Sequence, residues 1–209
     1  MGRCIIFCAG GFDGLLEKPT KNDYIIAADG GYAHVQKLGL TPDAVLGDFD
    51  SLGFVPEGAN VFPVEKDDTD AMLAVRHGLA LGYREFYLYG ALEGKRLDHP
   101  VANLQTLHFL ADHGAAGYLV GKEQMVTVVT DSLSFRAGAE GTISVFCMGE
   151  NAEGVCLSGL QYPLENGTLT PGFPLGVSNH FTGKEATVSV KKGSLLVIFD
   201  RKAFFYIHI

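Results

Sequence analysis

The strongest constraint on the fold is a series of short apolar runs, each followed by glycine or polar residues, with helical segments between them. Five such runs occur up to Gly121: "RCIIFCAG", "DYIIAADGG", "AVLGDFDS", "REFYLYGA" and "GYLVG". Runs of this kind are typical of strands that are buried on both faces of a parallel sheet. Their alternation with helices predicts βα units and therefore a mostly parallel α/β sheet.

Three helical segments are predicted between these strands. They are "GGYAHVQKLG" (30–39), "TDAMLAVRHGLALG" (69–82) and "DHPVANLQTLHFLADHG" (98–114). Each segment ends at a glycine, which suits the position just after the last helical turn. The third begins at Asp98 and carries Pro100 near its first turn, where proline is tolerated.

The pattern changes near Val126, beyond which short strand-like runs are separated by turns and helical periodicity is absent. The runs are "VTVVT", "TISVFCM", "GTLTP" and "ATVSVKKGSLLVIFD", and the turns are "RAGAEG", "MGEN", "ENG" and "KKG". This pattern predicts a smaller antiparallel β-sandwich. We therefore place an α/β domain at residues 1–124 and a β-sandwich domain at 125–209. The apolar end "AFFYIHI" is expected to pair in the sheet or at an interface, because full exposure would be costly.

Charge and cysteine usage limit the partners and the compartment. The net charge of −8 predicts no nucleic-acid partner and no anionic membrane surface. A membrane span is not expected, since the chain has no run of 18 apolar residues. The four cysteines form no C-x-x-C pair and lie in apolar, strand-like runs. We expect buried thiols and a cytoplasmic protein.

Polar clusters follow the apolar runs, at the carboxyl ends of the predicted strands. They are Asp29, Gly30 and Gly31; Asp48, Asp50 and Ser51; Lys66, Asp67, Asp68, Thr69 and Asp70; and Gly94, Lys95, Arg96 and Asp98. Ligands of parallel α/β sheets bind at this edge. Distant segments should therefore bring several carboxylates and three cations together.

Crowded carboxylates repel one another unless a cation or protons intervene. Oxygen ligands with room for water suit Mg²⁺, which usually takes one or two carboxylates together with substrate phosphates. Lys66, Lys95 and Arg96 are then suited to bind phosphate oxygens. The combination predicts phosphate transfer without a covalent nucleophile, driven by positioning and charge neutralisation.

Several of these residues also have a purely structural interpretation. Asp98 fits an N-cap as well as a site residue, and Thr69 or Asp68 fits the cap of the preceding helix. Asp29-Gly30-Gly31 taken alone is more typical of a turn, whereas the joint appearance of the clusters favours a site. His99 is as consistent with a buried or capping role as with catalysis. "CAGGFDG" is not G-x-G-x-x-G, but its glycines favour a close approach to a phosphate.

Four ordered motifs resemble the thiamine pyrophosphokinase family. They are "ADGG", "PDAVLGDFDS", "EKDDTDAMLAV" and "GALEGKRLDHPVANL". The resemblance continues in the second half through "GLQYPLENGTL" and "GVSNHF".

The resemblance implies a homodimer whose first domain binds the nucleotide and whose second domain binds thiamine. It implies transfer of pyrophosphate from ATP to the thiamine hydroxyl, which gives thiamine diphosphate and AMP, with Mg²⁺ as the metal. The expected metal ligands are Asp29, Asp48, Asp50 and Asp70. The expected ATP and phosphate contacts are Gly30, Gly31, Ser51, Lys66, Thr69, Lys95, Arg96 and His99.

The expected catalytic residues are Asp48, Asp50, Asp70 and Asp98, with Asp70 favoured as the proton acceptor and Asp98 second. The substrate contacts are Asp70 with Ser178, Asn179 and Phe181. Ser178 and Asn179 match a segment that, in the family, helps to form the thiamine pocket at the dimer interface. Relatives often carry tryptophan just beyond it, whereas this chain has no tryptophan. We expect the ring of Phe181 to replace it.

Two other functions fit the same residues. One is a pyrophosphokinase that acts on another primary alcohol, such as a hydroxymethylpterin. The other is a non-catalytic sensor that binds thiamine or a nucleotide; the presence of every acidic motif argues against it.

Overall fold

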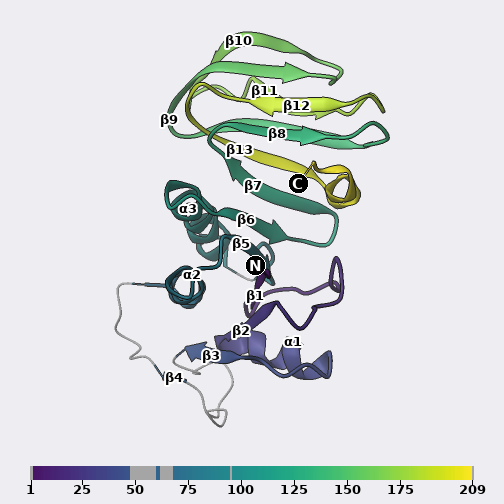
Figure 1. Cartoon of the computed structure of the whole chain (residues 1–209). Coiled ribbons are helices and arrows are strands. Elements are labelled where there is room, and N and C mark those ends of the chain that lie inside the picture. Colours follow the sequence, from purple (N-terminus) through teal and green to yellow (C-terminus); the bar gives the residue numbers. More distant parts are fainter. Residues whose placement is uncertain (1, 48–59, 62–67, 95, 209) are drawn as a thin grey trace. The chain divides into compact units, whose positions relative to one another are not determined.

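The computed structural model describes residues 2–47, 60–61, 68–94 and 96–208 (Figure 1). The chain forms two compact units, Met1–Lys122 (unit 1) and Glu123–Ile209 (unit 2). The sequence analysis places the domain boundary after residue 124.

Unit 1 contains a parallel sheet with the strand order β4-β3-β2-β1-β5-β6. Its strands are β1 (Cys4–Phe7), β2 (Tyr24–Ala28), β3 (Ala44–Gly47), β4 (Asn60–Val61), β5 (Glu85–Tyr89) and β6 (Ala116–Val120). All four residues of β1 are buried, as expected for a central strand. The five apolar runs are thus confirmed as strands, and the α/β fold class is confirmed with them.

The three predicted helices are confirmed. A 3-10 turn, η1 (Asp29–Gly31), leads into α1 (Tyr32–Lys37), and α2 (Asp70–Ala80) and α3 (Asp98–Asp112) follow later in the chain. Gly39, Gly82 and Gly114 have φ values of 66°, 91° and 65°, as expected for glycines that end helices. Among the described residues, no helix is long and apolar enough to cross a membrane.

Two close contacts place α2 and α3 on the same face of the sheet. A Cβ on Gly78 of α2 would lie 2.6 Å from the ring of Phe86. A Cβ on Gly117 would lie 2.5 Å from Leu110 of α3. Phe86 and Gly117 are paired residues of β5 and β6, so their positions point to one face.

The starts of α2 and α3 differ in their capping. Thr69 caps α2, since its Oγ1 accepts a hydrogen bond of 3.2 Å from the amide of Met72. Asp68 instead pairs with Arg76 at 3.0 Å. Of the two interpretations left open for Asp98, the N-cap is ruled out, because Leu97 is the N-cap and Asp98 is the first helical residue.

The neighbours of Asp98 give the physical reason. An Asp98 cap would accept from the amide of residue 100 or 101. Pro100 has no amide hydrogen, and the amide of Val101 donates to the carbonyl of Leu97 at 3.3 Å. Asp98 Oδ1 accepts instead from the amide of His99, at 3.1 Å.

Unit 2 is antiparallel, which confirms the second half of the predicted fold. Its central path is β7-β13-β9-β12-β8, and both β10 and β11 also pair with β9. Its strands are β7 (Gln124–Val129), β8 (Ser132–Phe135), β9 (Thr142–Ser158), β10 (Leu164–Leu169), β11 (Gly176–His180), β12 (Ala186–Ser189) and β13 (Lys192–Asp200).

Two of the expected turns lie inside strands. "MGEN" falls within β9, which bends there and continues (Figure 1). Gly149 takes φ 83°, and the pairing with β13 jumps from Ser194↔Met148 to Lys192↔Glu153. "ENG" likewise falls within β10, where Asn166 has φ 48°. Strand pairing continues on both sides of each irregularity and keeps the chain extended. A glycine or a residue with positive φ therefore bends the strand without ending it.

The apolar end of the chain packs within unit 2. Arg201–Tyr206 forms a 3-10 helix (η2), in which Ala203 and Phe204 are buried. Ile207 is also buried and forms an isolated bridge with Phe135.

All four cysteines are free thiols. Cys4 and Cys8 are buried, as expected, whereas Cys147 and Cys156 on β9 are partly exposed. The expectation of four buried thiols is therefore only half correct.

Candidate active site

Asp29 lies where the carboxyl ends of β2 and β3 meet. It follows β2 directly, is buried, and has the left-handed φ of 47° that aspartate tolerates better than most residues. A Cβ placed on Gly47, the last residue of β3, would lie 3.1 Å from both Cα and Cβ of Asp29. The end of β3 therefore packs against the turn that carries Asp29; Asp48 and Asp50 come next in the sequence and lie outside the described residues.

Gly31 fixes the turn that carries Asp29. A Cβ at Gly31 would lie 1.8 Å from the carbonyl oxygen of Phe7, at the end of β1. Only glycine permits this approach, so the turn Asp29–Gly31 packs directly on the carboxyl end of β1. Gly30, between them, is partly exposed.

Asp70 reaches the same edge from the first turn of α2. Burial, and next the negative charge of Asp70, raise the pKa of the Cys8 thiol to about 12. Cys8 directly follows β1, and α2 leads from the end of β4 back to the start of the parallel strand β5, so its first residue, Asp70, lies at the carboxyl edge of the sheet. The two described acidic residues of the predicted metal set, Asp29 and Asp70, therefore lie at one edge of the sheet, as the sequence analysis predicts.

Arg96 and Asp98 form an exposed ion pair in the segment after β5. Arg96 donates from Nη2 and Nε to the two oxygens of Asp98, at 2.5 and 3.2 Å. The hydrogen bond from Arg96 lowers the pKa of Asp98, and the same bond raises the pKa of Arg96. His99 is exposed and joins the pair through its backbone amide, which donates to Asp98. The expected trio Arg96, Asp98 and His99 is thus brought together.

The glycines of "CAGGFDG" approach the protein's own backbone closely. Gly10 donates to the carbonyl of Gly90 at 2.9 Å, and a Cβ on Gly10 would lie 2.0 Å from the carbonyl oxygen of Glu93. Nε2 of His34 lies 2.8 Å from the carbonyl oxygen of Gly10. Gly10 is thus packed against the segment after β5, whereas the expected approach of these glycines to a phosphate stays a prediction.

Five of the sequence-predicted site residues lie outside the described residues: Asp48, Asp50, Ser51, Lys66 and Lys95. Within the described part of the chain, no group of three or more His, Cys, Asp or Glu side chains is placed to hold a metal ion. Asp29 and Asp70 supply hard carboxylate oxygens, which are the donors that Mg²⁺ prefers. The chemistry of these donors therefore fits Mg²⁺.

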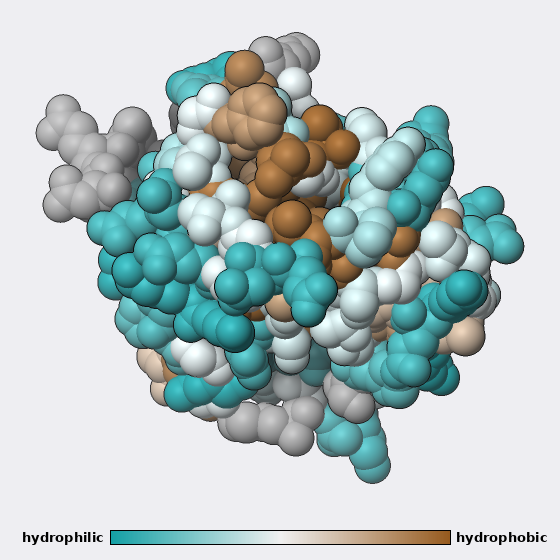
Figure 2. Space-filling model, turned by 90° about the horizontal axis from the view of Figure 1, so that it is seen from above, coloured by the Kyte–Doolittle hydropathy of each residue, from teal (hydrophilic) through white to brown (hydrophobic). Residues whose placement is uncertain are grey.

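Unit 2 has a pocket of about 130 Å³ beside the Ser178-Asn179 segment. Its lining is mostly apolar: Leu157, Tyr162, Pro163, Leu164, Leu175, Gly176, Val177 and Asn179. Figure 2 looks down on this end of unit 2 and shows apolar residues grouped between polar ones. The ring of Tyr162 is the aromatic group of the lining, and its residue is 59% exposed.

The three substrate contacts expected in unit 2 differ in exposure. Ser178 is exposed and has φ 57°, whereas Asn179 is only 3% exposed. Phe181 is 8% exposed, and its ring packs edge-on against Phe135 at 4.8 Å between centroids. Most of the Phe181 ring is thus used in the core of unit 2.

Sequence reasoning did not select Tyr162 as a site residue. The residue stands in "GLQYPL", a motif that the sequence analysis quotes, but its place depends on how residues 160–163 pair with β11. The signal that could have identified Tyr162 is its position as an aromatic residue within the motif "GLQYPL".

Comparisons with known proteins agree with this architecture. The model of the thiamin pyrophosphokinase catalytic domain matches residues 16–119, and the model of the thiamin pyrophosphokinase vitamin B1 binding domain matches residues 132–195. The thiamine pyrophosphokinase of Bacillus subtilis is 27% identical over 183 residues, which cover 83% of this chain and 85% of that protein.

Solved structures give the same result. The crystal structure of thiamine pyrophosphokinase from Bacillus subtilis matches with a TM-score of 0.82 and 25% identity, over 96% of this chain and 99% of that one. Thiamin pyrophosphokinase from Geobacillus thermodenitrificans matches with a TM-score of 0.77 and 26% identity, over 96% and 97%. Since both family domains match in order and the fold agrees over nearly the whole chain, the protein belongs to the thiamine pyrophosphokinase family.

Proposed function

We propose that this protein is a thiamine pyrophosphokinase, which transfers pyrophosphate from ATP to the hydroxyl of thiamine and releases AMP. The observation that carries the proposal is the match of both family domains to the two units, in the family's order. The carboxylates of Asp29 and Asp70, at the ligand-binding edge of the unit 1 sheet, supply chemistry of the kind that this reaction needs.

The proposed metal is Mg²⁺. Asp29 and Asp70 would hold it, together with Asp48 and Asp50, which follow β3 in the sequence. When bound, the ion would offset charge on the polyphosphate. The burial of Asp29 supports this role, since a buried carboxylate strongly favours a nearby cation.

The proposed phosphate contacts surround this edge. Arg96 is exposed and makes a two-point contact with Asp98, a geometry that also suits phosphate oxygens. A polyphosphate carries more charge than one carboxylate and would compete with Asp98 for Arg96. The remaining proposed contacts are Gly30, Gly31, Ser51, Lys66, Thr69, Lys95 and His99.

We propose Asp70 as the residue that accepts the proton of the thiamine hydroxyl. The attack of this hydroxyl on the β-phosphorus of ATP requires its proton to leave, and a nearby carboxylate can take it. Asp98 is the second candidate. Because Arg96 lowers the pKa of Asp98, pairing makes that carboxylate a weaker base than an ordinary aspartate, so it is placed second.

The acceptor site is proposed in unit 2, at the pocket beside Ser178 and Asn179. Thiamine carries flat rings and a positive charge, and an exposed tyrosine ring suits both features. Tyr162 supplies such a surface in this pocket. The burial of Phe181 favours Tyr162 over Phe181 for that contact.

A homodimer is proposed through the same face of unit 2. Four large apolar or aromatic residues on and beside the pocket are about half exposed or more: Tyr162, Phe173, Leu175 and Val177. Grouped apolar exposure of this kind (Figure 2) marks an interaction surface. A second copy is the proposed occupant, and the test is the mass in solution compared with the 22.4 kDa of one chain.

A cytoplasmic location is proposed from the four free thiols.

The deciding experiment is an assay of the purified protein with ATP, Mg²⁺ and thiamine that measures both AMP and thiamine diphosphate. Equal amounts of the two products are expected. Turnover of a hydroxymethylpterin but not of thiamine would establish a different acceptor. Calorimetric binding of thiamine without any AMP release would establish a sensor.

A further inference from the structure

We infer that Asn179 is a positioning residue, which serves acceptor binding by fixing Tyr162 in the wall of the unit 2 pocket and not by contacting the substrate. The inference rests on the proposed function for the identity of the acceptor. The role of Asn179 itself is argued from the geometry of unit 2.

A β-bulge turns Asn179 toward the interior. In the pairing of β11 with β9, Gly176 faces Val145 and Asn179 faces Ile143, so three steps along β11 match two along β9. Ser178 lies in this irregular stretch with φ 57°, and its amide donates to Ser144 Oγ at 3.0 Å. A bulge redirects the side chains that follow it, and here the buried side chain is that of Asn179.

The amide group of Asn179 is committed to backbone partners. Its Oδ1 accepts from the amide of Tyr162 and from the amide of His180, both at 2.9 Å. Its Nδ2 donates to the carbonyl of Tyr162 at 2.7 Å. An amide oxygen has two acceptor positions, and backbone donors occupy both. At 3% exposure, Asn179 has little surface left with which to touch a substrate.

These bonds hold the backbone of Tyr162 from both sides. Next to it, the amide of Gln161 donates to the carbonyl of His180 at 2.9 Å, and Leu160 bridges Phe181. The side chain of Asn179 thus extends this pairing by one more residue. The Tyr162 ring itself projects from a fixed backbone and remains exposed at the pocket. A ring held in this way loses little conformational freedom on binding, which favours affinity.

The first test needs no substrate. Because the chain contains no tryptophan, Tyr162→Trp introduces a single tryptophan at the pocket, which can be excited selectively over the remaining tyrosines. Adding Asn179→Ala should lower the fluorescence anisotropy of that tryptophan and raise its quenching by iodide. Thr182→Val is the matched control, since Thr182 Oγ1 donates to the carbonyl of Gly159, at 2.7 Å, in the same connection. This control should leave both readings unchanged.

The second test uses turnover. Asn179→Ala and Tyr162→Ala should each raise the KM for thiamine about tenfold, with the KM for ATP unchanged, because lost hydrogen bonds or ring contacts weaken only the acceptor site. The double variant should be no worse than the poorer single variant, since both remove the same element. Asn179→Asp replaces the donor with an oxygen that faces the carbonyl of Tyr162, so it should raise the KM for thiamine at least as much as Asn179→Ala.

The outcomes separate the two proposals. Additive effects in the double variant, or an anisotropy unaffected by Asn179→Ala, would overturn the positioning role. A lowered anisotropy in a protein that does not turn over thiamine would retain the role of Asn179 and reject the proposed function. If Asn179→Ala does not fold, Asn179→Ser, which keeps a small polar group at this position, replaces it in both tests, with the same directions expected.

Discussion

Gly47 and Asp29 are in direct contact: a Cβ on Gly47 would lie 3.1 Å from the Asp29 backbone nitrogen, Cα and Cβ. The end of β3 therefore helps to fix the acidic turn after β2. Gly47 therefore supports the candidate site residue Asp29 although it has no side chain.

Gly47→Ala should lower activity strongly. Alanine must take φ 150° and also press on Asp29, so the turn that carries the carboxylate has to move. Gly39→Ala is the matched control, because Gly39 has φ 66° but open space around its Cβ position. Both should lose about 1–3 kcal/mol of unfolding free energy from backbone strain. Only Gly47→Ala should also lose turnover; equal activity in the two variants would show that the contact does not matter.

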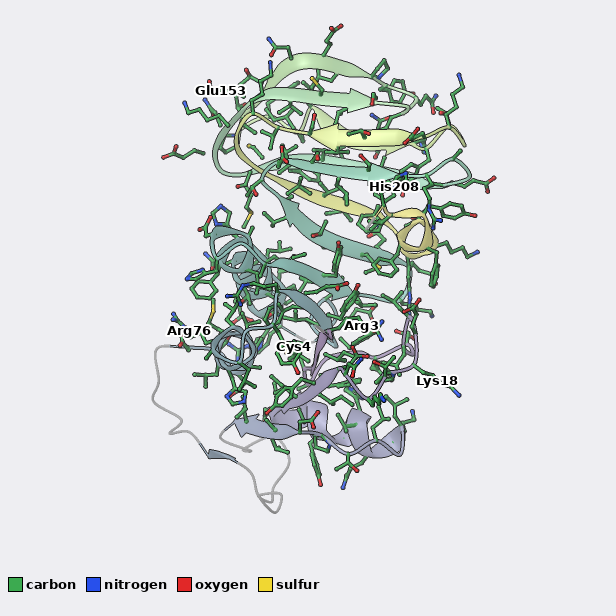
Figure 3. The ribbon with its side chains drawn as sticks, in the orientation of Figure 1. Arg3, Cys4, Lys18, Arg76, Glu153 and His208 are labelled. Carbon is green, nitrogen blue, oxygen red and sulfur yellow. The ribbon has the colours of Figure 1, made fainter. Side chains whose placement is uncertain are left out.

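The Arg3–Asp23 pair should make stability depend on pH. Burial alone would raise the pKa of Asp23, but hydrogen bonds from Arg3 and from the amides of Thr20 and Arg3 outweigh it and hold the pKa well below its usual range. Arg3 donates to Asp23 at 2.8 and 3.2 Å, and it also contacts Glu17 and the Lys18 carbonyl. Arg3 and Lys18 are labelled in Figure 3. These hydrogen bonds stabilise the segment that connects β1 and β2.

A depressed folded-state pKa adds stability that is fully present above the unfolded pKa of about 4 and is lost as pH falls below it. Asp23→Asn should therefore cost about 2 kcal/mol at pH 7 in urea unfolding, with a smaller cost at pH 3. Glu17→Gln, at an exposed pair, should cost less than about 1 kcal/mol. A cost of Asp23→Asn that is independent of pH would contradict this account.

Arg96→Gln should raise the KM for ATP about tenfold or more, because a charge-assisted contact to phosphate is lost. The melting temperature should hardly change, since an exposed ion pair contributes little to stability. Steady-state kinetics with ATP varied, together with thermal unfolding, check both parts. Arg84→Gln is a suitable control, as Arg84 donates to the carbonyls of Leu79 and Tyr83, away from this segment. A KM change confined to thiamine would refute the assignment of Arg96.

Asp70→Asn should reduce kcat more than Asp98→Asn does. Asp70 is the proposed proton acceptor, and loss of a positioned base typically costs about 100-fold or more. Asp98 has its pKa lowered by Arg96 and serves mainly to hold that guanidinium. Turnover of the two variants at saturating substrates decides between them, and the opposite order would make Asp98 the base.

Local sequence signals predicted most of the fold. The strand Cys4–Phe7 follows from its apolar run, and the ends of all three helices follow from glycines. Where the prediction was wrong, a distant or neighbouring residue decided the outcome. Gly149 was expected in a turn, but β9 continues through it because β13 and β10 pair on either side. Asp98 fitted a cap by its sequence, but Pro100 has no amide hydrogen and the amide of Val101 donates to the carbonyl of Leu97.

The site shows the same division. The order of the apolar runs in the sequence indicated which acidic residues follow which strands. Asp29 and Asp70 were therefore expected at the carboxyl edge of the parallel sheet. The contact between Gly47 and Asp29 depends on how two strands end side by side, which no local pattern contains. Phe181 was expected at the substrate and lies mostly in the core, whereas Tyr162, for which the sequence analysis made no prediction, is exposed at the pocket. The bridge between Leu160 and Phe181 belongs to a pairing of two segments that are distant in the sequence. This pairing turns the ring of Phe181 into the core and leaves the ring of Tyr162 exposed.

The most direct measurement of the central claim is the rate of AMP release by Asp29→Asn with ATP, Mg²⁺ and thiamine. Asparagine has the same shape as aspartate and also tolerates the left-handed backbone of this position, so the fold should be retained. The account predicts a rate at least ~100-fold below that of the unaltered protein, because a charge at the metal and phosphate site is lost. A folded Asp29→Asn protein with a rate within about threefold of the unaltered one would contradict it.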